Sequence, residues 1–346
     1  MHFASDNTGP VHPRVMQALA KANDGWAMPY GNDALTEAVV AQVREVFEAP
    51  EAIVMLCATG TAANVLLLST LAEPFETIFC SACAHIHEDE CNAPEFFTGG
   101  TKLTLVEHVA GKMSPDALRR AIEGEGNRGV HGPRRGPVSI TQVTEKGALY
   151  TLDEVRALCD LAKSYGLATH MDGARFANAV AALGCTPAEA SWKAGVDALS
   201  FGGTKNGLMA VEAMVLFDPA KAEELDYRRK RGAQLFSKQR YLAAQMQAYL
   251  DGGLWLEMAQ SANANAARLA AGIEAGGGRL HAAQESNLIF ADLPRATHRR
   301  LKAAGAQYHL SGSLDGAGDE MLEARFVADW SLSEALVDQF IALLKA

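Results

Sequence analysis

One lysine in this sequence lies in a setting that favours covalent chemistry. Lys205 belongs to the glycine-rich segment 200–207 (SFGGTKNG), which begins within a short apolar run that predicts a buried strand. Lysine is rarely buried unless its amine is used, and that amine can form an imine with a carbonyl compound. A surface lysine in a turn is the structural alternative, and this segment alone does not decide between the two.

An acid lies at the end of another predicted strand. Asp172 follows the apolar run 167–171 and precedes a Gly-Ala-Arg sequence that ends at Arg175. A helix cap at Asp172 with Arg175 on the surface is the structural alternative. One strand–helix–strand unit between Asp172 and Lys205 would bring both side chains to the same edge of a parallel sheet, which favours a functional interpretation of both.

Two weaker signals also follow predicted strands. Thr59-Gly60-Thr61 opens an apolar helix, where backbone N–H groups and the helix dipole can bind phosphate, although such a sequence is often only a cap. His85 follows the run 77–80 and could stack on an aromatic ring, although a lone histidine is more often structural. An amine, an acid, a stacking ring and a phosphate site are together what pyridoxal phosphate (PLP) requires of a protein.

The elements that must position these residues alternate along the chain. Apolar runs predict strands at 53–56, 77–80, 103–106, 138–141, 167–171, 198–201 and 214–217. Helical patterns separate them, for example after the capping box that begins at Thr151. This alternation predicts an α/β fold with a mostly parallel sheet that has helices on both faces.

Changes in pattern predict the domain organisation. We expect an N-terminal arm at 1–30 with substrate-site residues, a large domain at 31–245 and a small C-terminal α/β domain at 246–346. The three glycines at 276–278 mark a break. Strands at 288–290 and 325–327 and a helix at 332–344 are predicted beyond it.

Composition limits the classes of partner. The chain has 41 acidic and 31 basic residues and a formal net charge of −10, which argues against nucleic acid as the main partner. No apolar run approaches the ~18 residues of a membrane span. Residues 1–6 lack the pattern of a secretory signal peptide. We therefore expect a cytoplasmic protein with reduced cysteines and a small-molecule substrate.

A zinc-binding module is the alternative from another functional class. Cys80, Cys83, His85, His87 and Cys91 lie close together in the sequence, and Cys-x-x-Cys spacing suits zinc. No second Cys-x-x-Cys pair occurs, and Cys80 falls within a predicted strand. We therefore expect no metal.

The whole set of motifs resembles the low-specificity L-threonine aldolases, PLP enzymes of the aspartate-aminotransferase-like superfamily. The resemblance covers nearly the whole chain. It rests on these residues and segments in order: Phe3–Asn7, Tyr30–Asp33, Thr59–Thr61, His85, Thr144–Gly147, Asp172–Arg175, Lys205 and Arg325. The lysine segment departs from the usual family pattern, but the lysine itself is retained.

The resemblance implies a role for each site residue. Lys205 would carry the cofactor as a Schiff base, and Asp172 would pair with the pyridinium nitrogen. His85 would stack on the ring and serve as the candidate base, with Asp89 orienting it or a water. The implied cofactor contacts also include Thr59, Gly60, Thr61, Arg175 and Lys238, the last at a partner's phosphate. The implied substrate contacts are Ser5, Asp6, Tyr30, His85, Arg175 and Arg325.

The implied reaction cleaves L-threonine, L-allo-threonine or a related β-hydroxy-α-amino acid into glycine and an aldehyde. The implied assembly is a homodimer or homotetramer with active sites at the dimer interface. A PLP lyase that catalyses β-elimination, or a transaminase, would share Lys205 and Asp172 and remains an alternative. A further alternative is a protein with the same fold that binds a small molecule but catalyses no reaction. The sequence does not rank the substrates.

Overall fold

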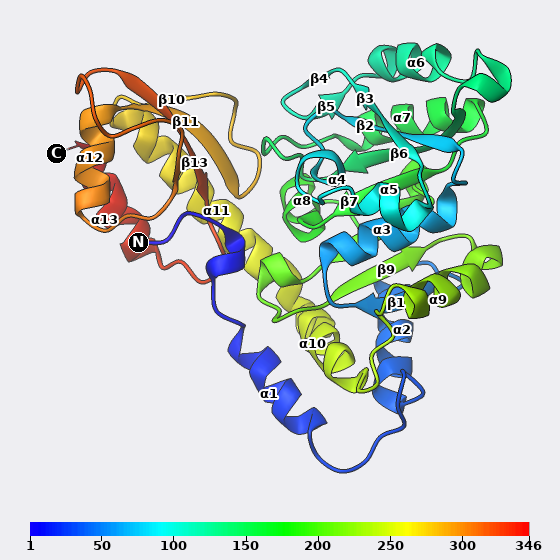
Figure 1. Cartoon of the computed structure of the whole chain (residues 1–346). Helices are drawn as coiled ribbons and strands as arrows, with labels where there is room; N and C mark the ends of the chain where they lie inside the picture. Colours follow the sequence, from blue (N-terminus) through cyan, green and yellow to red (C-terminus); the bar gives the residue numbers. More distant parts are fainter. Residues whose placement is uncertain (346) are drawn as a thin grey trace.

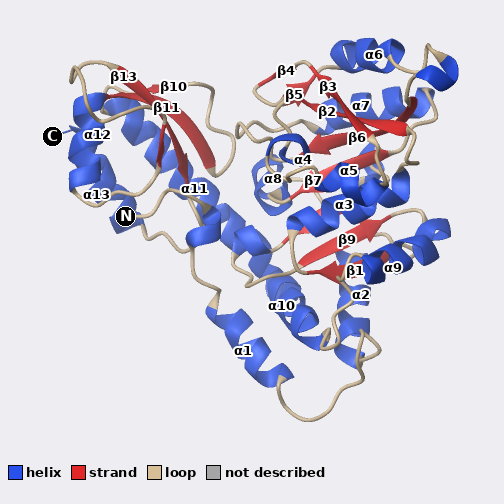
Figure 2. Cartoon of the chain, in the orientation of Figure 1, coloured by secondary structure: helices blue, strands red, loops and turns tan. Residues whose placement is uncertain are grey.

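The computed structural model describes residues 1–345, and they form two bodies joined by one long helix (Figure 1). The larger body contains a mixed sheet between helices, and the smaller body packs helices on one antiparallel sheet (Figure 2). Helix α11 (Leu254–Ala275) begins beside the larger body and ends within the smaller one.

The sheet of the larger body has the order β1-β9-β8-β7-β6-β2-β3. Strands β2, β3, β6, β7 and β8 pair in parallel, whereas β9 pairs antiparallel with both β1 and β8. The predicted fold class, with its mostly parallel sheet, is therefore confirmed. The strands are β1 (Ile53–Cys57), β2 (Glu76–Ser81), β3 (Lys102–Val106), β6 (Arg134–Thr141), β7 (Thr169–Gly173), β8 (Ala198–Gly202) and β9 (Glu212–Leu216).

Helices cover both faces of this sheet because successive strand residues point to opposite sides. On β8, Ala198 packs with helices α3 and α9, whereas Leu199 and Phe201 join the core on the other face. One face carries α3 (Gly60–Leu71), α4 (His85–Glu88), α5 (Ala93–Thr98) and α9 (Ala222–Arg231). The other carries α2 (Ala34–Val46), α6 (Pro115–Gly124), α7 (Leu152–Ser164), α8 (Phe176–Leu183) and α10 (Arg240–Leu250).

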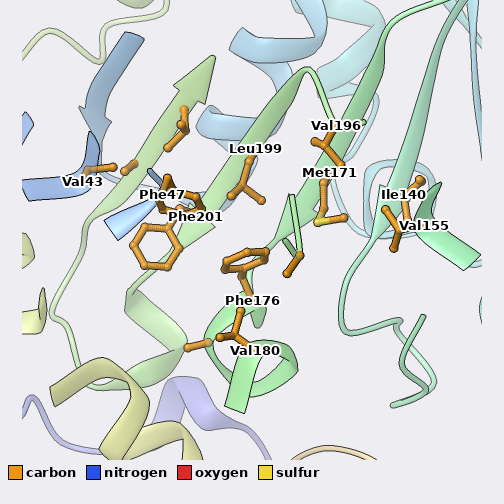
Figure 3. Packing of buried hydrophobic residues seen from close by; sticks show 14 of the residues in the cluster. Val43, Phe47, Ile140, Val155, Met171, Phe176, Val180, Val196, Leu199 and Phe201 are labelled. Carbon is orange, nitrogen blue, oxygen red and sulfur yellow. The ribbon is translucent and has the colours of Figure 1, made fainter. Parts of the chain in front are cut away.

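Aromatic rings form the centre of the second face (Figure 3). The ring of Phe47 lies 5.7 Å from that of Phe176 and 5.3 Å from that of Phe201, centroid to centroid. The Phe201 ring also meets Trp255 of α11 edge-on at 5.5 Å. This cluster therefore anchors the connecting helix to the larger body.

The smaller body contains a sheet of order β10-β11-β13-β12. Its elements are β10 (Arg279–Leu280), β11 (Leu288–Pro294), α12 (Arg295–Ala303), β12 (His309–Leu310), β13 (Met321–Val327) and α13 (Glu334–Lys345). Phe3 is fully buried in its core, and the Phe3 carbonyl accepts a hydrogen bond from Val327 N–H at 2.8 Å. The chain's first residues thus pack against its last strand. The domain limits given above stay a prediction, and Ala346 lies outside the described residues.

The remaining elements are short or peripheral. Helix α1 (Pro13–Ala22) packs on α10, and β4 (His108–Val109) pairs with β5 (Lys112–Met113) as a small hairpin. Our predictions did not include β4, β5, β10 and β12, because two-residue strands leave no periodic pattern. Within residues 1–345, no helix has the length and apolar character needed to cross a bilayer.

Replacing Phe201 with alanine should destabilise the protein by about 3–5 kcal/mol, because it leaves a cavity among fully buried aromatic rings. Urea denaturation followed by fluorescence measures this change. Phe96→Ala is the matched control, since the Phe96 side chain is 78% exposed and should change stability little. Equal effects of the two substitutions would contradict the assignment of Phe201 to the core.

Candidate active site

The carboxyl ends of the parallel strands surround a cavity of about 230 Å³. β9 also contributes, because it runs antiparallel and begins at this edge. The cavity brings together Thr59, Lys205, His85 and Asp172, which the sequence had singled out from four separate strands. Its lining residues are Asn7, Ala58, Thr59, Gly60, Thr61, Asn64, His85, Asp172, Ala174, Thr204, Lys205 and Glu212.

The start of α3 offers an anion site to this cavity. Thr59 caps the helix by accepting a hydrogen bond from Ala62 N–H at 3.1 Å, and its carbonyl accepts from Ala63 N–H. The N–H groups of Gly60 and Thr61 precede these and have no intrahelical partner. A Cβ atom on Gly60 would meet nothing within 4 Å, so the space beside these N–H groups is open.

A close approach of two backbones positions Lys205. A Cβ atom on Gly202 would lie 2.5 Å from the Ala174 carbonyl oxygen, so only glycine allows β8 to end this close to the segment after Asp172. Asn206 then fixes the turn, because its Nδ2 donates to the Tyr249 hydroxyl at 2.9 Å and to the Trp255 carbonyl at 2.8 Å. Lys205 is thereby held at the same edge as Asp172.

The surroundings of Lys205 make its ammonium group easier to deprotonate. Burial, followed by the Arg175 charge, lowers the pKa of Lys205 below its ordinary value, although Asp6, Asp172 and Glu212 act in the opposite direction. A neutral amine is the nucleophile that imine formation requires. Burial also raises the pKa of Glu212 to about 7.

Asp172 remains an anion inside the protein. Its Oδ2 accepts a hydrogen bond from Asn64 Nδ2 at 2.9 Å, and its Oδ1 accepts from Ala174 N–H at 3.0 Å. Burial alone would raise the pKa of Asp172, but the charges of His85 and Lys205 and the Ala174 N–H outweigh it and hold the pKa below its ordinary value. The cavity therefore contains a fixed negative charge.

His85 begins α4 and is held by two acids. Its backbone N–H donates to Glu145 Oε1 at 2.8 Å, and its Nδ1 lies 2.9 Å from Glu90 Oε1. The contact with the imidazole therefore comes from Glu90, not from Asp89, to which we had assigned the orienting role. Asp89 is exposed just beyond α4, and its action through a water stays a prediction.

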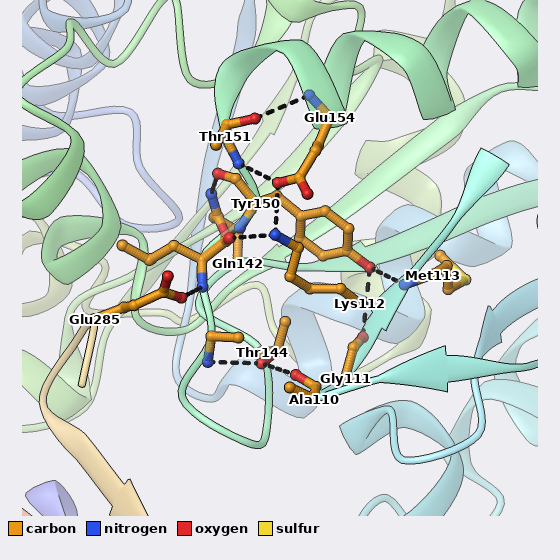
Figure 4. Close-up of polar contacts among 12 residues, drawn as sticks. Ala110, Gly111, Lys112, Met113, Gln142, Thr144, Tyr150, Thr151, Glu154 and Glu285 are labelled. Carbon is orange, nitrogen blue, oxygen red and sulfur yellow. Dashed lines mark hydrogen bonds and ion pairs between the residues drawn. The ribbon is translucent and has the colours of Figure 1, made fainter. Parts of the chain in front are cut away.

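The loop that carries Glu145 is firmly held (Figure 4). Gln142 and Tyr150 exchange two hydrogen bonds, of 2.8 and 3.0 Å, between the Gln142 amide and the Tyr150 backbone. The Tyr150 hydroxyl accepts from Met113 N–H at 2.7 Å. Glu285, from the loop before β11, accepts from Leu149 N–H at 2.8 Å and so ties the smaller body to this loop.

A buried ion pair joins the N-terminal arm to the larger body. Asp6 accepts two hydrogen bonds from Arg175, from Nε at 2.6 Å and from Nη2 at 3.0 Å. Asn287 Nδ2 also donates to Asp6 at 3.1 Å. Two of the three Arg175 nitrogens are thus engaged by Asp6. Ser5, which we expected at the substrate, caps the short helix Asp6–Thr8 by accepting from Asn7 N–H.

Arg325 differs from Arg175 because, among residues 1–345, it donates only one side-chain hydrogen bond. Its Nη2 donates to the Ala4 carbonyl at 3.1 Å, whereas its buried Nε has no protein partner among the described residues. Tyr30 and Lys238 are exposed and do not line the cavity. Their contributions to the site of a partner subunit stay predictions.

The cysteines of the zinc alternative do not converge. Cys80 is buried in β2, Cys83 lies 3.3 Å from the Ser81 hydroxyl, and Cys91 is exposed. Within residues 1–345, the only group of three or more His, Cys, Asp and Glu side chains whose candidate ligand atoms all lie within 4.8 Å of one another is His85, Glu90 and Asp172. His85 and Asp172 line the cavity described above, and Glu90 contacts the His85 ring.

Sequence reasoning missed Asn64, Glu90 and Glu212 as site residues. Asn64 had a detectable signal, since it is the one amide within a helix whose residues 62–70 are otherwise apolar or hydroxylic. Glu90 and Glu212 had none, because only the fold brings Glu212 to the cavity lining and Glu90 to the His85 ring. Glu145 lies within a segment that supported the resemblance, but no role had been assigned to it.

Comparison with known families agrees with this geometry. The family model described as beta-eliminating lyase matches residues 2–296. The chain therefore belongs to the beta-eliminating lyase family, a class of enzymes with this fold.

Within that family the chain groups with the low-specificity L-threonine aldolases. It is 40% identical to the low specificity L-threonine aldolase of Pseudomonas sp. (strain NCIMB 10558), over 99% of this chain and 97% of the relative. It is 41% identical to that of Pseudomonas aeruginosa, over 95% of this chain and 92% of the relative.

Solved structures give the same result for the fold. A threonine aldolase from Leishmania major superposes with a TM-score of 0.92 at 26% identity, covering 99% of this chain and 98% of that one. Serine palmitoyltransferase from Sphingomonas wittichii superposes with a TM-score of 0.73 at 19% identity, covering 100% and 86%, and this likeness shows the fold alone.

Asp6→Asn should destabilise the protein by about 3–5 kcal/mol at neutral pH, because it leaves the mostly buried Arg175 without its anion. Burial alone would raise the pKa of Asp6, but Arg175 and Lys205 outweigh it and hold the pKa below its ordinary value. The stabilisation is therefore complete above the unfolded-state pKa and is lost as the pH falls through the lower folded-state pKa.

Urea denaturation of the wild type and of Asp6→Asn across this pH range measures the difference. We expect the two stabilities to converge as the medium becomes acidic. A difference that stays constant down to pH values below the folded-state pKa would show that Asp6 does not stabilise the protein as an anion.

Proposed function

We propose that this protein is a PLP-dependent aldolase that cleaves β-hydroxy-α-amino acids, with L-threonine and L-allo-threonine as the reference substrates, into glycine and an aldehyde. One observation carries the proposal. A lysine with a lowered pKa, an anionic aspartate, an imidazole and a free helix N-terminus surround one cavity in a chain 40% identical to a named threonine aldolase.

The residues of the cavity fit the cofactor. The open space beside Gly60, next to two N–H groups without intrahelical partners, suits the phosphate. The anionic Asp172 suits a protonated pyridine nitrogen, and Lys205 supplies the amine for an imine with the aldehyde. When bound, pyridoxal phosphate supplies the electron sink that accepts the electron pair of the breaking Cα–Cβ bond.

The protein's own side chains then orient the substrate and move protons. We assign the substrate carboxylate to Arg325, because its buried Nε has no partner within residues 1–345 and its planar fork suits a carboxylate. Arg175 adds its remaining nitrogen, since Asp6 engages the other two. His85 accepts the proton of the β-hydroxyl group as the Cα–Cβ bond breaks and the aldehyde forms. A proton added at Cα then completes glycine.

We expect the protein to act in the cytoplasm as a homodimer or homotetramer. The exposed positions of Tyr30 and Lys238 are compatible with contacts to a partner subunit. In such a dimer, Lys238 would place a positive charge beside the cofactor phosphate in the partner's site. The N-terminus of α3 by itself offers that phosphate only N–H groups.

The purified protein, supplied with PLP, should absorb near ~420 nm and release glycine and an aldehyde from L-threonine, L-allo-threonine or L-phenylserine. Lys205→Ala should lose both the band and the activity, whereas Lys163→Ala, an exposed lysine at the end of α7, should keep both. If keto acid and ammonia formed in place of glycine, the reaction would be a β-elimination. A retained band in Lys205→Ala would refute the central assignment.

Arg325→Gln should lower kcat/KM by about 10- to 100-fold, mainly through KM, because it removes charge-assisted hydrogen bonds to the substrate carboxylate. Arg325→Lys keeps the charge but not the planar fork and should recover only part of the loss. Steady-state kinetics with L-threonine measure both variants. An unchanged KM in Arg325→Gln would remove this residue from substrate binding.

A further inference from the structure

One buried amide connects Asp172, which lines the cavity, with Glu90, which contacts the His85 ring. Asn64, inside α3, donates from Nδ2 to Glu90 Oε1 and to Asp172 Oδ2, both at 2.9 Å. Its Oδ1 accepts from the Ser200 hydroxyl at 2.7 Å. Because the amide oxygen is taken by Ser200, the two N–H groups of Asn64 must face the two carboxylates.

A chain of hydrogen bonds behind Asn64 can be satisfied with this orientation. The Ser200 hydroxyl has one proton and donates it to Asn64, so it must accept from His170 Nε2 at 3.2 Å. His170 Nδ1 then accepts from the Ser139 hydroxyl at 3.0 Å. Burial lowers the pKa of His170 to about 4, so a neutral ring with one N–H satisfies the whole chain.

Glu90 has an unusual environment for an acid. Its side chain is fully buried, its Oε1 accepts from Asn64 and meets His85 Nδ1 at 2.9 Å, and its Oε2 has no protein partner among the described residues. When Glu90 is ionised, its carboxylate can only accept hydrogen bonds, so His85 Nδ1 then carries the proton. The other ring nitrogen, Nε2, then keeps its lone pair when His85 is neutral.

We propose that Glu90, held by Asn64, is a positioning residue that fixes the ring orientation and the Nδ1–H tautomer of His85. The inference deepens the proposed function, on which it rests for its catalytic consequence, because Nε2 is then the atom that accepts the substrate proton. The arrangement of the His85 ring itself can be tested without any reaction.

The surrounding charges determine the direction of the effect on pH. The hydrogen bond to Glu90 raises the pKa of His85 above its ordinary value, with Asp172 acting in the same direction and burial and Lys205 opposing. Glu145 contacts only the backbone N–H of His85. Burial raises the pKa of Glu90, and its hydrogen bonds to His85 and Asn64 act against this.

Removing the Glu90 charge should therefore lower the pKa of His85. A base must be unprotonated, so the rise of kcat/KM with pH should move to lower pH in Glu90→Gln. Loss of ring orientation should also reduce kcat, within the roughly 10²- to 10⁴-fold that a general base supplies. Glu90→Asp restores the charge and should bring the His85 pKa back toward that of the wild type.

The test combines NMR titration of ¹⁵N-histidine-labelled holoenzyme with pH profiles of kcat/KM for L-threonine. Glu88→Gln is the matched control, because Glu88 is an exposed neighbour on the same segment. We expect neutral wild-type His85 to carry its proton on Nδ1. We also expect its pKa to fall in Glu90→Gln, to recover in Glu90→Asp and to be unchanged in Glu88→Gln.

The outcomes separate the two proposals. A wild-type His85 protonated on Nε2 overturns the inference even if no variant folds, and so does a Glu90→Gln titration identical to that of the wild type. A lower His85 pKa in Glu90→Gln without a matching move of the kcat/KM profile supports the inference, but it removes His85 as the base in the proposed function.

Discussion

The site depends on one close contact between two backbones. The end of β8 approaches the segment after Asp172 so tightly that a Cβ atom on Gly202 would overlap the Ala174 carbonyl. This contact brings the lysine and the aspartate to one strand edge, and the buried aromatic cluster around Phe201 lies directly behind it. The chemistry of the cavity therefore depends on a backbone contact between residues that themselves have no reactive side chain.

Charges buried at this edge need hydrogen-bond partners, and each of the two acids has two of them. Asp172 is stabilised by Asn64 and by a backbone N–H, and Glu90 by Asn64 and His85. Leaving either acid unpaired would cost several kcal/mol. Asn64 serves both acids at once, which explains why an amide lies within a helix that is otherwise apolar or hydroxylic.

The smaller body takes part in the site through the N-terminal arm. Phe3 is buried in the core of the smaller body, whereas Asp6, three residues later, pairs with Arg175 of the larger body. Arg325 comes from β13 and donates to the same arm at Ala4. The arm thus contacts both arginines, and among residues 1–345 it engages two nitrogens of Arg175 but one of Arg325.

The sequence by itself determined the seven strands of the larger sheet, their mostly parallel order and the residues that follow several of them. Local apolar runs, glycine segments and capping boxes carry that information, so Lys205, Asp172, Thr59 and His85 were found without coordinates. Only the tertiary structure decided that Glu90 contacts His85, because a one-residue difference from Asp89 changes the side of the chain on which a carboxylate lies. The sequence likewise did not reveal the ion pair between Asp6 and Arg175, since 169 positions separate the two residues and only folding brings them together.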